Sequence, residues 1–255
     1  MAYLKTCALV LLVVRVWSPS QATSTLRRHT KVEVSRALAI TSRTYRTISI
    51  PPGASQNLRC STGCAAFEWC HLWCHDVVSS ECIFTNIFVM PDYEETNKDD
   101  ALVCYTLRRK SHVGRATIES TPEKTDEQPL RVKENLLDEY YVTKDKDQCA
   151  LLITTAFPWF LLDFGEPVTF QHVVIVAQPG TNANLFENVE VRTGTSPVST
   201  LGDFSSYAMF AKFAGPATAN QVIEFEVTAP VMARFVSIQV MNGDTLLQVC
   251  HIEVF

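Results

Sequence analysis

Apolar and polar residues alternate along the C-terminal part of the chain. In residues 222–227 (VIEFEV) and 235–240 (FVSIQV) apolar side chains recur at every second position, which is typical of strands with one buried face. Further short runs rich in β-branched and aromatic residues follow between 159 and 255, and Gly, Pro, Asn and Asp separate them. Seven such runs without a segment of helix length predict an all-β jelly-roll sandwich.

The N-terminal part has a different pattern. Residues 25–56 are polar and rich in β-branched side chains. Cys70 and Cys74 are spaced by one helical turn, so we expect a helix that carries both. A strand at 101–107 would bring Cys104 back to that helix. A helix with short strands, held by disulfides rather than by a large core, predicts a small α+β disulfide-rich module.

The first 22 residues have the layout of a secretory signal peptide. Lys5 supplies the positive start, the run from Cys7 to Val14 is apolar, and small residues follow it. A membrane anchor would need about 20 apolar residues, and Arg15 interrupts this run. We therefore expect cleavage after about residue 22 and a secreted, extracellular protein.

Cysteine usage divides the chain in two. Of nine cysteines, Cys7 leaves with the predicted signal peptide, and the even number that remains indicates disulfides in an oxidising compartment. Two are isolated and the others cluster, which separates a cysteine-rich module at 25–108 from the sandwich at 112–255. Clustered cysteines allow many pairings, and their spacing does not choose among them. The isolated cysteines are Cys149 and Cys250, and the clustered ones are Cys60, Cys64, Cys70, Cys74, Cys82 and Cys104.

A zinc site is the alternative use of the clustered cysteines. Cys70, His71, Cys74 and His75 lie within six residues, and zinc prefers thiolate and imidazole ligands. Structural zinc motifs usually pair CxxC with a second half-site, whereas the spacing here is CxxxC in a chain expected to be secreted. Disulfides are therefore the preferred interpretation.

Charge and motifs argue against other classes of function. The net charge is −5, whereas nucleic-acid binding needs many cations to neutralise phosphates. No nucleophile elbow, paired His/Cys/Asp arrangement or metal-binding helix motif occurs, which indicates a protein that is not an enzyme. The basic residues between Arg108 and Arg115 are interpreted as part of a solvated linker, with a cleavage site or a contact with anionic glycans as the alternatives.

The cysteine-rich module resembles the PAN/apple family over about residues 55–110. The resemblance rests on the CxxxC of Cys70 and Cys74 placed on a helix, on Cys82 eight residues later, and on Cys104 in a terminal strand. It implies a module that contacts proteins or carbohydrates and has no catalytic residues.

Five ordered blocks of the C-terminal part resemble the discoidin or galactose-binding-like jelly roll, most closely its F-type lectin (fucolectin) branch. In fucolectins a cysteine before the Pro-Trp block bonds to one in the last strand. The resemblance therefore implies a disulfide between Cys149 and Cys250. The blocks are VGRATIEST at 113–121, PWFLLDFGEPV at 158–168, FENVEVRTG at 186–194, ARFVSIQV at 233–240 and LLQVCHIEVF at 246–255.

The same resemblance locates the saccharide site of the family. Fucolectins hold fucose with a His two residues after the first cysteine and with a downstream Arg-x-Asp-x-x-x-x-Arg segment. The corresponding positions here are Leu151, Gln178, Gly180 and Leu185. Sugar hydroxyls lose water on binding, and leucine offers no donor to replace it. We therefore expect this ligand-binding site to be degenerate and the fucose triad to be lost.

A calcium loop is also implied by the resemblance. Glu134, Asn135 and Asp138 offer the oxygen ligands that calcium prefers, but the acid expected after the last cysteine is His251 here. Calcium is the cofactor that the resemblance suggests, and a solvated acidic loop is the alternative.

Two tyrosines and two lysines are the predicted loop contacts. Tyr140 and Tyr141 adjoin Lys144 and Lys146, and aromatics beside cations stack on sugars or insert at lipid interfaces. Packing within the fold is the alternative for the tyrosines.

Together these features predict a secreted, non-enzymatic recognition protein with no nucleic-acid partner. Its partners would be extracellular glycans or proteins. A phospholipid membrane surface is the first alternative, and a secreted zinc-binding protein or enzyme is the second.

Overall fold

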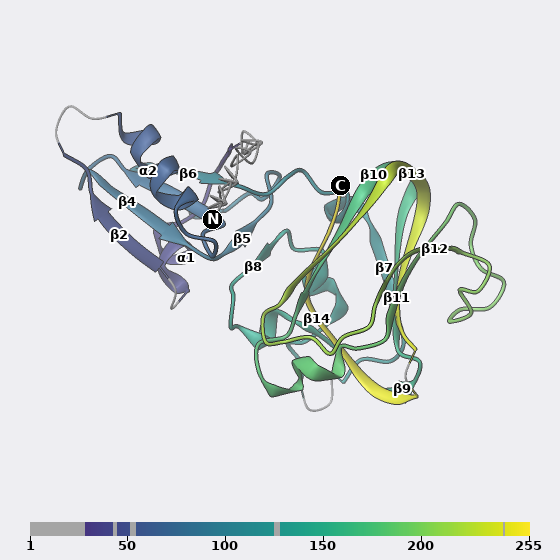
Figure 1. The fold of residues 1–255 in the computed structure, drawn as a ribbon. Coiled ribbons are helices and arrows are strands. Elements are labelled where there is room, and N and C mark those ends of the chain that lie inside the picture. The colour runs from purple at the N-terminus through teal and green to yellow at the C-terminus, as the bar shows by residue number, and fades with distance from the viewer. Residues whose placement is uncertain (1–28, 43–44, 52–54, 125–127, 242) are drawn as a thin grey trace, which may run out of the picture.

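The computed structural model describes residues 29–255 except 43–44, 52–54, 125–127 and 242. The predicted signal peptide at 1–22 lies outside the described residues. Two β-rich parts follow one another along the chain, as Figure 1 shows. In the described part of the chain, none of the helices has the length and hydrophobicity of a membrane span.

The N-terminal part is an antiparallel five-stranded sheet with two short helices. The strand order is β1-β6-β3-β4-β2, and the longer helix packs on β3 and β4. The predicted α+β character of this part is confirmed. The elements are β1 (Thr30–Val32), α1 (Arg36–Thr41), β2 (Tyr45–Ser49), α2 (Gln56–Ala65), β3 (Leu72–Asp76), β4 (Glu81–Thr85) and β6 (Leu102–Thr106).

The predicted helix through Cys70 and Cys74 is wrong. Helix α2 lies earlier and carries Cys60 and Cys64, which have the same spacing, whereas Cys74 lies in strand β3. Every residue of β3 is buried, because α2 covers one face of the sheet and a second apolar cluster covers the other. A strand buried on both faces has no polar alternation, so its sequence does not distinguish it from a buried helix.

Close packing of α2 on the sheet depends on Gly63. A Cβ atom added at this glycine would meet the ring of Phe84 on β4 at 2.5 Å. Phe84 is 1% exposed, so the ring has little room to move away. Glycine at this position therefore lets the helix approach the strand closely enough for Cys60 and Cys64 to reach their partners.

Four disulfides join all eight described cysteines. In the N-terminal part the bonds are Cys60–Cys82, Cys64–Cys70 and Cys74–Cys104. The predicted Cys149–Cys250 bond is confirmed. Because Cys70 and Cys74 are both oxidised, neither sulfur is a thiolate, and the alternative zinc site at residues 70–75 is contradicted.

The C-terminal part is a β-sandwich, as predicted. Its strands belong to one continuous antiparallel sheet in the order β12-β11-β13-β10-β14-β9, with β7 paired to β10. The strands are β7 (Thr117–Ser120), β9 (Ala150–Ala156), β10 (Trp159–Ala177), β11 (Val189–Gly194), β12 (Ala208–Phe213), β13 (Val222–Val240) and β14 (Asp244–Val254).

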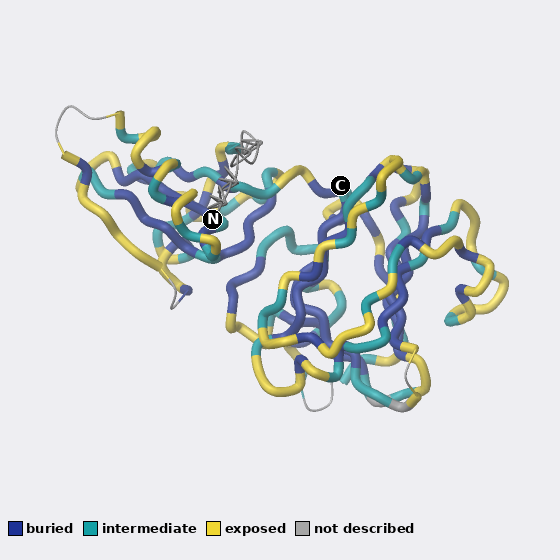
Figure 2. The backbone as a smooth tube through the Cα atoms, viewed as in Figure 1, coloured by how far each residue is buried: buried dark blue, intermediate teal, exposed yellow. Residues whose placement is uncertain are grey.

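Two long strands fold this sheet into two layers. The first half of β10 pairs with β7 and with the last part of β13, whereas its second half pairs with β14 and with the first part of β13. The β10–β13 register shifts between Asp163 and Val168 and again between Phe170 and His172, and such irregularities bend strands. The inner faces share one apolar core, and Figure 2 shows the buried residues following these strands.

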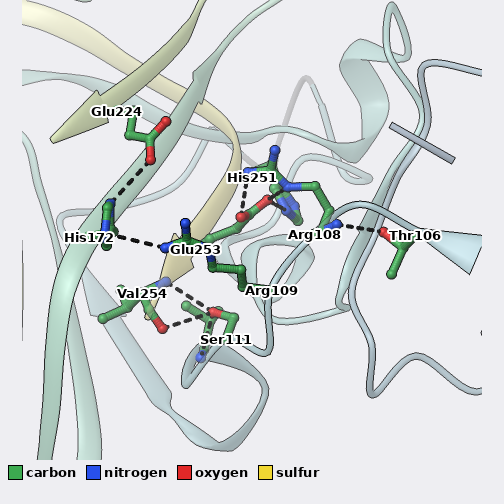
Figure 3. Close-up of polar contacts among 10 residues, drawn as sticks. Thr106, Arg108, Arg109, Ser111, His172, Glu224, His251, Glu253 and Val254 are labelled. Carbon is green, nitrogen blue, oxygen red and sulfur yellow. Dashed lines mark hydrogen bonds and ion pairs between the residues drawn. The ribbon is translucent and has the colours of Figure 1, made fainter. Parts of the chain in front are cut away.

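A short β-ladder and a buried ion pair join the two parts. Strand β5 (Phe88–Val89) of the N-terminal part pairs with β8 (Tyr140–Tyr141) of the C-terminal part. Arg108 donates two hydrogen bonds to Glu253 on β14, from Nε to Oε1 at 2.7 Å and from Nη2 to Oε2 at 2.5 Å. Figure 3 shows this pair with His251, whose Nε2 lies 3.2 Å from Oε1 of Glu253.

The expected solvated linker is only partly correct, because Arg109, Lys110 and Arg115 are exposed whereas Arg108 is packed at the junction. The guanidinium carbon of Arg108 lies 5.0 Å from the ring centroid of Phe88, and Glu253 is fully buried. Ser111 lies beside the end of β14, where its Oγ accepts a hydrogen bond from Val254 N at 3.0 Å (Figure 3). A charged stretch looks solvated in the sequence when its counter-ion lies far away in the chain.

The ion pair sets the charge state of Glu253. Burial by itself would raise the pKa of this carboxyl, but the Arg108 charge and hydrogen bonds from His251 and Arg108 outweigh burial and lower the pKa to about 2. The folded state then holds fewer protons than the unfolded state at mildly acidic pH. The stabilisation is complete above the ordinary glutamate pKa and is lost as the pH falls from about 4.5 towards 2.

We predict that Glu253→Gln lowers the free energy of unfolding by about 3–5 kcal/mol at pH 7, because it leaves the Arg108 charge buried without a counter-ion. Urea denaturation at a series of pH values measures this. The wild-type protein should lose stability below pH 4.5 more steeply than the variant. Glu119→Gln, on the exposed side of β7, is the control, and equal effects of the two substitutions would contradict the prediction.

Loss of the Cys149–Cys250 disulfide should be costly because it closes a long segment, with a sequence separation of 101. A loop of that length is worth about 4.7 kcal/mol in the chain-entropy model, against about 2 kcal/mol for a loop of a few residues. We predict that Cys149→Ala with Cys250→Ala lowers the unfolding midpoint more than Cys64→Ala with Cys70→Ala does. Calorimetry of both double variants measures the difference, and the opposite order would contradict it.

Candidate functional site

A cleft of about 310 Å³ lies at one end of the sandwich. It is formed where β9 and β14 lie side by side and where the chain leaves β10. Leu151, Gln178 and Gly180 line it, and Leu185 lines an adjoining recess that shares Gln178. The structure therefore gathers all four residues that the sequence analysis assigned to the degenerate site.

Leu151 on β9 forms part of the cleft wall. It pairs in register with Gln248 on β14, so the two side chains lie on the same side of the sheet. The backbone of Leu151 also holds the neighbouring loop, because its N–H donates to Arg131 O and its carbonyl accepts from Lys124 N, both at 3.0 Å. Leu151 thus supplies an apolar surface and fixes two further lining residues.

Two amide side chains at the cleft lack hydrogen-bond partners. Gln178 directly follows β10 and is 7% exposed, and no described residue hydrogen-bonds its side-chain amide. Gln248 is 8% exposed, and its Nε2 has no acceptor among the described residues. Leaving the buried Nε2 of Gln248 without an acceptor costs about 1–3 kcal/mol. Water or a ligand with hydroxyl groups would satisfy these two side chains.

Gly180 is required by the backbone. Its φ is +136°, a conformation that side-chain-bearing residues rarely adopt. It precedes the 3₁₀ turn η4 (Thr181–Leu185), which brings Asn182 to the cleft. The aspartate that the family resemblance places at position 180 would be strained in this conformation.

Cationic side chains line the same cleft. They are Lys124, Arg131 and Lys146. Arg131 is 8% exposed, and its Nε donates to Asp147 Oδ1 at 3.2 Å. The sequence analysis identified only Lys146 as a contact residue. Acidic and basic residues are interleaved between Glu123 and Glu134, so no charge pattern marked Arg131.

The predicted loop contacts at Tyr140 and Tyr141 are corrected by the structure. Tyr141 is fully buried in strand β8, and its Oη donates to Asn220 Oδ1 at 3.2 Å. Tyr140 packs on Tyr93 with ring centroids 5.2 Å apart. Both tyrosines therefore pack where the two parts meet; Tyr141 is not available for insertion into a lipid interface, and Tyr140 is half-buried. Aromatic side chains suit a buried interface as well as a ligand-binding loop, so the sequence did not distinguish the two.

The two predicted lysines have different positions. Lys144 is exposed in the turn after β8 and has a φ of +77°. Lys146 lies in the 3₁₀ turn η3 (Lys146–Gln148) and is the only one of the four predicted loop contacts that lines the cleft.

The residues predicted to bind calcium have other partners. Glu134 lies 3.3 Å from Lys133 Nζ, and Asn135 Nδ2 donates to Leu130 O at 2.8 Å and Asp147 O at 3.0 Å. Burial raises the pKa of Asp138 to about 7. Across the described part of the chain no group of three or more His, Cys, Asp or Glu is arranged to hold a metal ion. The calcium site stays a prediction.

Comparison with known proteins shows where this fold occurs. The chain is similar to a fucolectin (F-lectin) from Morone saxatilis (striped bass) serum, with a TM-score of 0.50 and 16% identity over 56% of this chain and 47% of that chain. It therefore spans less than half the length of that fucolectin. This likeness supports the β-sandwich fold.

Two further solved structures are similar at lower scores. The lectin domain of lectinolysin complexed with Lewis B antigen gives a TM-score of 0.45 at 17% identity, over 56% of this chain and 95% of that one. The family 32 carbohydrate-binding module of C. perfringens NanJ, in complex with galactose, gives 0.43 at 11% identity, over 56% and 94%. No protein-family model and no curated protein matches the sequence.

The raised pKa of Asp138 generates a prediction about stability. Between about pH 4 and pH 7 the folded state holds a proton that the unfolded state releases, so the free energy of unfolding should fall as the pH rises through this window. Asp138→Asn should remove that fall, because the amide keeps the Oδ1 acceptor used by Tyr140 N and does not ionise. Denaturation at pH 5 and pH 8 measures this.

The same variant tests the calcium hypothesis. If calcium binds through Asp138, adding it at pH 7 should raise the melting temperature of the wild-type protein but not that of the variant.

For the pH dependence, an equal loss of stability between pH 5 and pH 8 in the wild-type protein and in Asp138→Asn would contradict the prediction for Asp138.

Proposed function

We propose that this chain is a secreted, non-enzymatic recognition protein that binds glycans in the cleft at the end of its C-terminal sandwich. The observation that carries the proposal is the convergence of Leu151, Gln178, Gly180 and Leu185 around one cleft and its adjoining recess. These are the positions at which the resemblance to fucolectins places the saccharide. The similarity in fold to the striped bass fucolectin supports a saccharide as the ligand class.

The chemistry of the cleft suits sugar hydroxyls. An amide side chain offers two N–H donors and a carbonyl acceptor, and Gln178 presents these groups without a described protein partner. Leu151 and Leu246 add apolar surface beside it, against which the C–H groups of a sugar ring can pack. A ligand hydroxyl that accepted a hydrogen bond from the buried Gln248 Nε2 would remove the desolvation cost of that group.

Fucose bound in the family manner is not the ligand that we propose. The positions that carry a His and two Arg in fucolectins are Leu151, Gln178 and Leu185, and a single amide replaces several rigid donors. The scaffold would be kept while the bound sugar differs. The N-terminal part, which we propose is PAN/apple-like, would add contacts to proteins or carbohydrates.

Secretion is supported by two features. Residues 1–22 have the layout of a signal peptide, and the described cysteines form four disulfides, which persist in oxidising compartments. Phospholipid binding, the first alternative, loses its main support because Tyr140 and Tyr141 are packed between the two parts. The zinc alternative loses its thiolates to disulfides.

A glycan-array screen of the mature chain, with and without calcium, tests the proposal. We expect binding to a restricted set of glycans without selectivity for terminal fucose. Absence of binding to every glycan would contradict the proposed function. Fucose-selective binding would contradict the loss of the family site.

Gln178→Ala should weaken binding of the glycans identified on the array by about tenfold, because it removes a buried hydrogen-bonding group. Isothermal titration calorimetry measures the dissociation constants. Gln56→Ala, on helix α2 of the other part, is the matched control and should leave them unchanged. Equal affinities for the wild-type protein and Gln178→Ala would show that the cleft is not the binding site.

A further inference from the structure

Positive charge distinguishes this cleft from a neutral sugar site. Lys124, Arg131 and Lys146 line it, and none of its lining residues in the described part of the chain carries a carboxylate. Lys124 already has an interaction partner of its own, so the charge available to a ligand depends on the other two side chains.

Of these two side chains, Arg131 gives the stronger argument for an anion-binding site. More than nine-tenths of the residue is buried, and the hydrogen bond from Nε to Asp147 Oδ1 occupies one of its five N–H donors. No other described residue accepts from its guanidinium side chain. Among the described residues, therefore, neither Nη group has a hydrogen-bond partner, and the side chain lines the cleft. The edge that they form presents two parallel N–H bonds, which match a carboxylate or a sulfate.

Asp147 leaves that edge available. It contacts Arg131 through the Nε side at 3.2 Å, and its backbone carbonyl accepts a hydrogen bond from Asn135 Nδ2. Asp147 does not line the cleft. It orients the guanidinium without occupying the position that a ligand oxyanion would take.

Lys146 adds a second cation to the lining of the cleft. It begins the turn η3 and is exposed, and no acid in the described part of the chain forms an ion pair with it. The neighbouring Asp145 caps this turn, because its Oδ1 accepts from Asp147 N at 3.0 Å. The nearest carboxylates on the chain therefore have structural partners, and the Lys146 ammonium is available to an anion.

We propose that the cleft takes an acidic saccharide, one whose carboxylate or sulfate lies on Arg131 and Lys146 while its hydroxyls face Gln178. This inference rests on the proposed function and adds the charge class of the ligand. A uronic or sialic acid and a sulfated sugar supply the same oxyanion chemistry, so the experiment includes both.

Calorimetric titration of the mature chain with lactose, sialyllactose and sulfated lactose tests the inference. We expect at least one acidic ligand to bind about tenfold or more tightly than lactose, because hydrogen bonds to charged groups are stronger than neutral ones. Raising the salt concentration should reduce this advantage. The stronger of the two acidic ligands identifies the oxyanion.

Variants locate the effect. Arg131→Gln and Lys146→Gln should each reduce the preference for the acidic ligand and leave lactose binding within about twofold. Arg59→Gln, an exposed arginine on α2 of the other part, is the matched control and should change neither. Because Arg131 is buried, Lys146→Gln on the exposed turn decides the test if Arg131→Gln does not fold.

The outcomes separate this inference from the proposed function. Equal affinity for lactose and both acidic ligands would overturn the acidic-saccharide inference while leaving glycan binding in place. A preference for acidic ligands that survives both substitutions would overturn the assignment to Arg131 and Lys146. Binding of no saccharide, neutral or acidic, on the titration or on the array would overturn the proposed function and this inference with it.

Discussion

Strand β14 connects the parts of this protein that matter for its function. Cys250 in this strand bonds to Cys149, which fixes the start of β9 and therefore the position of Leu151 at the cleft. Glu253, near the end of the same strand, holds Arg108 in a buried ion pair at 2.5 and 2.7 Å. One strand thus positions the cleft wall on one side and the N-terminal part on the other.

The buried ion pair at this junction carries a large desolvation cost, because two charges are removed from water. Glu253 is stabilised by Arg108 and by His251, and Phe88 covers the guanidinium. This group disfavours other arrangements of the two parts, since a displaced Arg108 would leave a buried carboxylate without a counter-ion. The paired strands β5 and β8 reinforce that arrangement.

Much of the sandwich was predictable from the sequence, but only part of the site was. Period-two alternation in β13 and turn residues between strands predict the sandwich. Positions 151, 178 and 185 could be predicted as one site because the resemblance to fucolectins supplied their alignment. The sequence predicts a helix through Cys70 and Cys74, whereas the helix lies at 56–65. The reason is that β3 is buried on both faces and so lacks the alternation of apolar and polar residues that marks a strand. The roles of Arg108, Arg131 and Tyr141 could not be predicted, because their partners, among them Glu253, lie in distant strands and loops.

The central claim is that the cleft beside Leu151 and Gln178 binds the ligand. Backbone amide chemical shifts of the isotope-labelled mature chain, recorded while an acidic lactose derivative (sialyllactose or the sulfated form) is added, test it most directly. The account predicts that the largest shifts occur at Arg131, Leu151, Gln178 and Gly180, with small changes in the N-terminal sheet. Shifts concentrated in the N-terminal sheet, or at the opposite end of the sandwich, would contradict it.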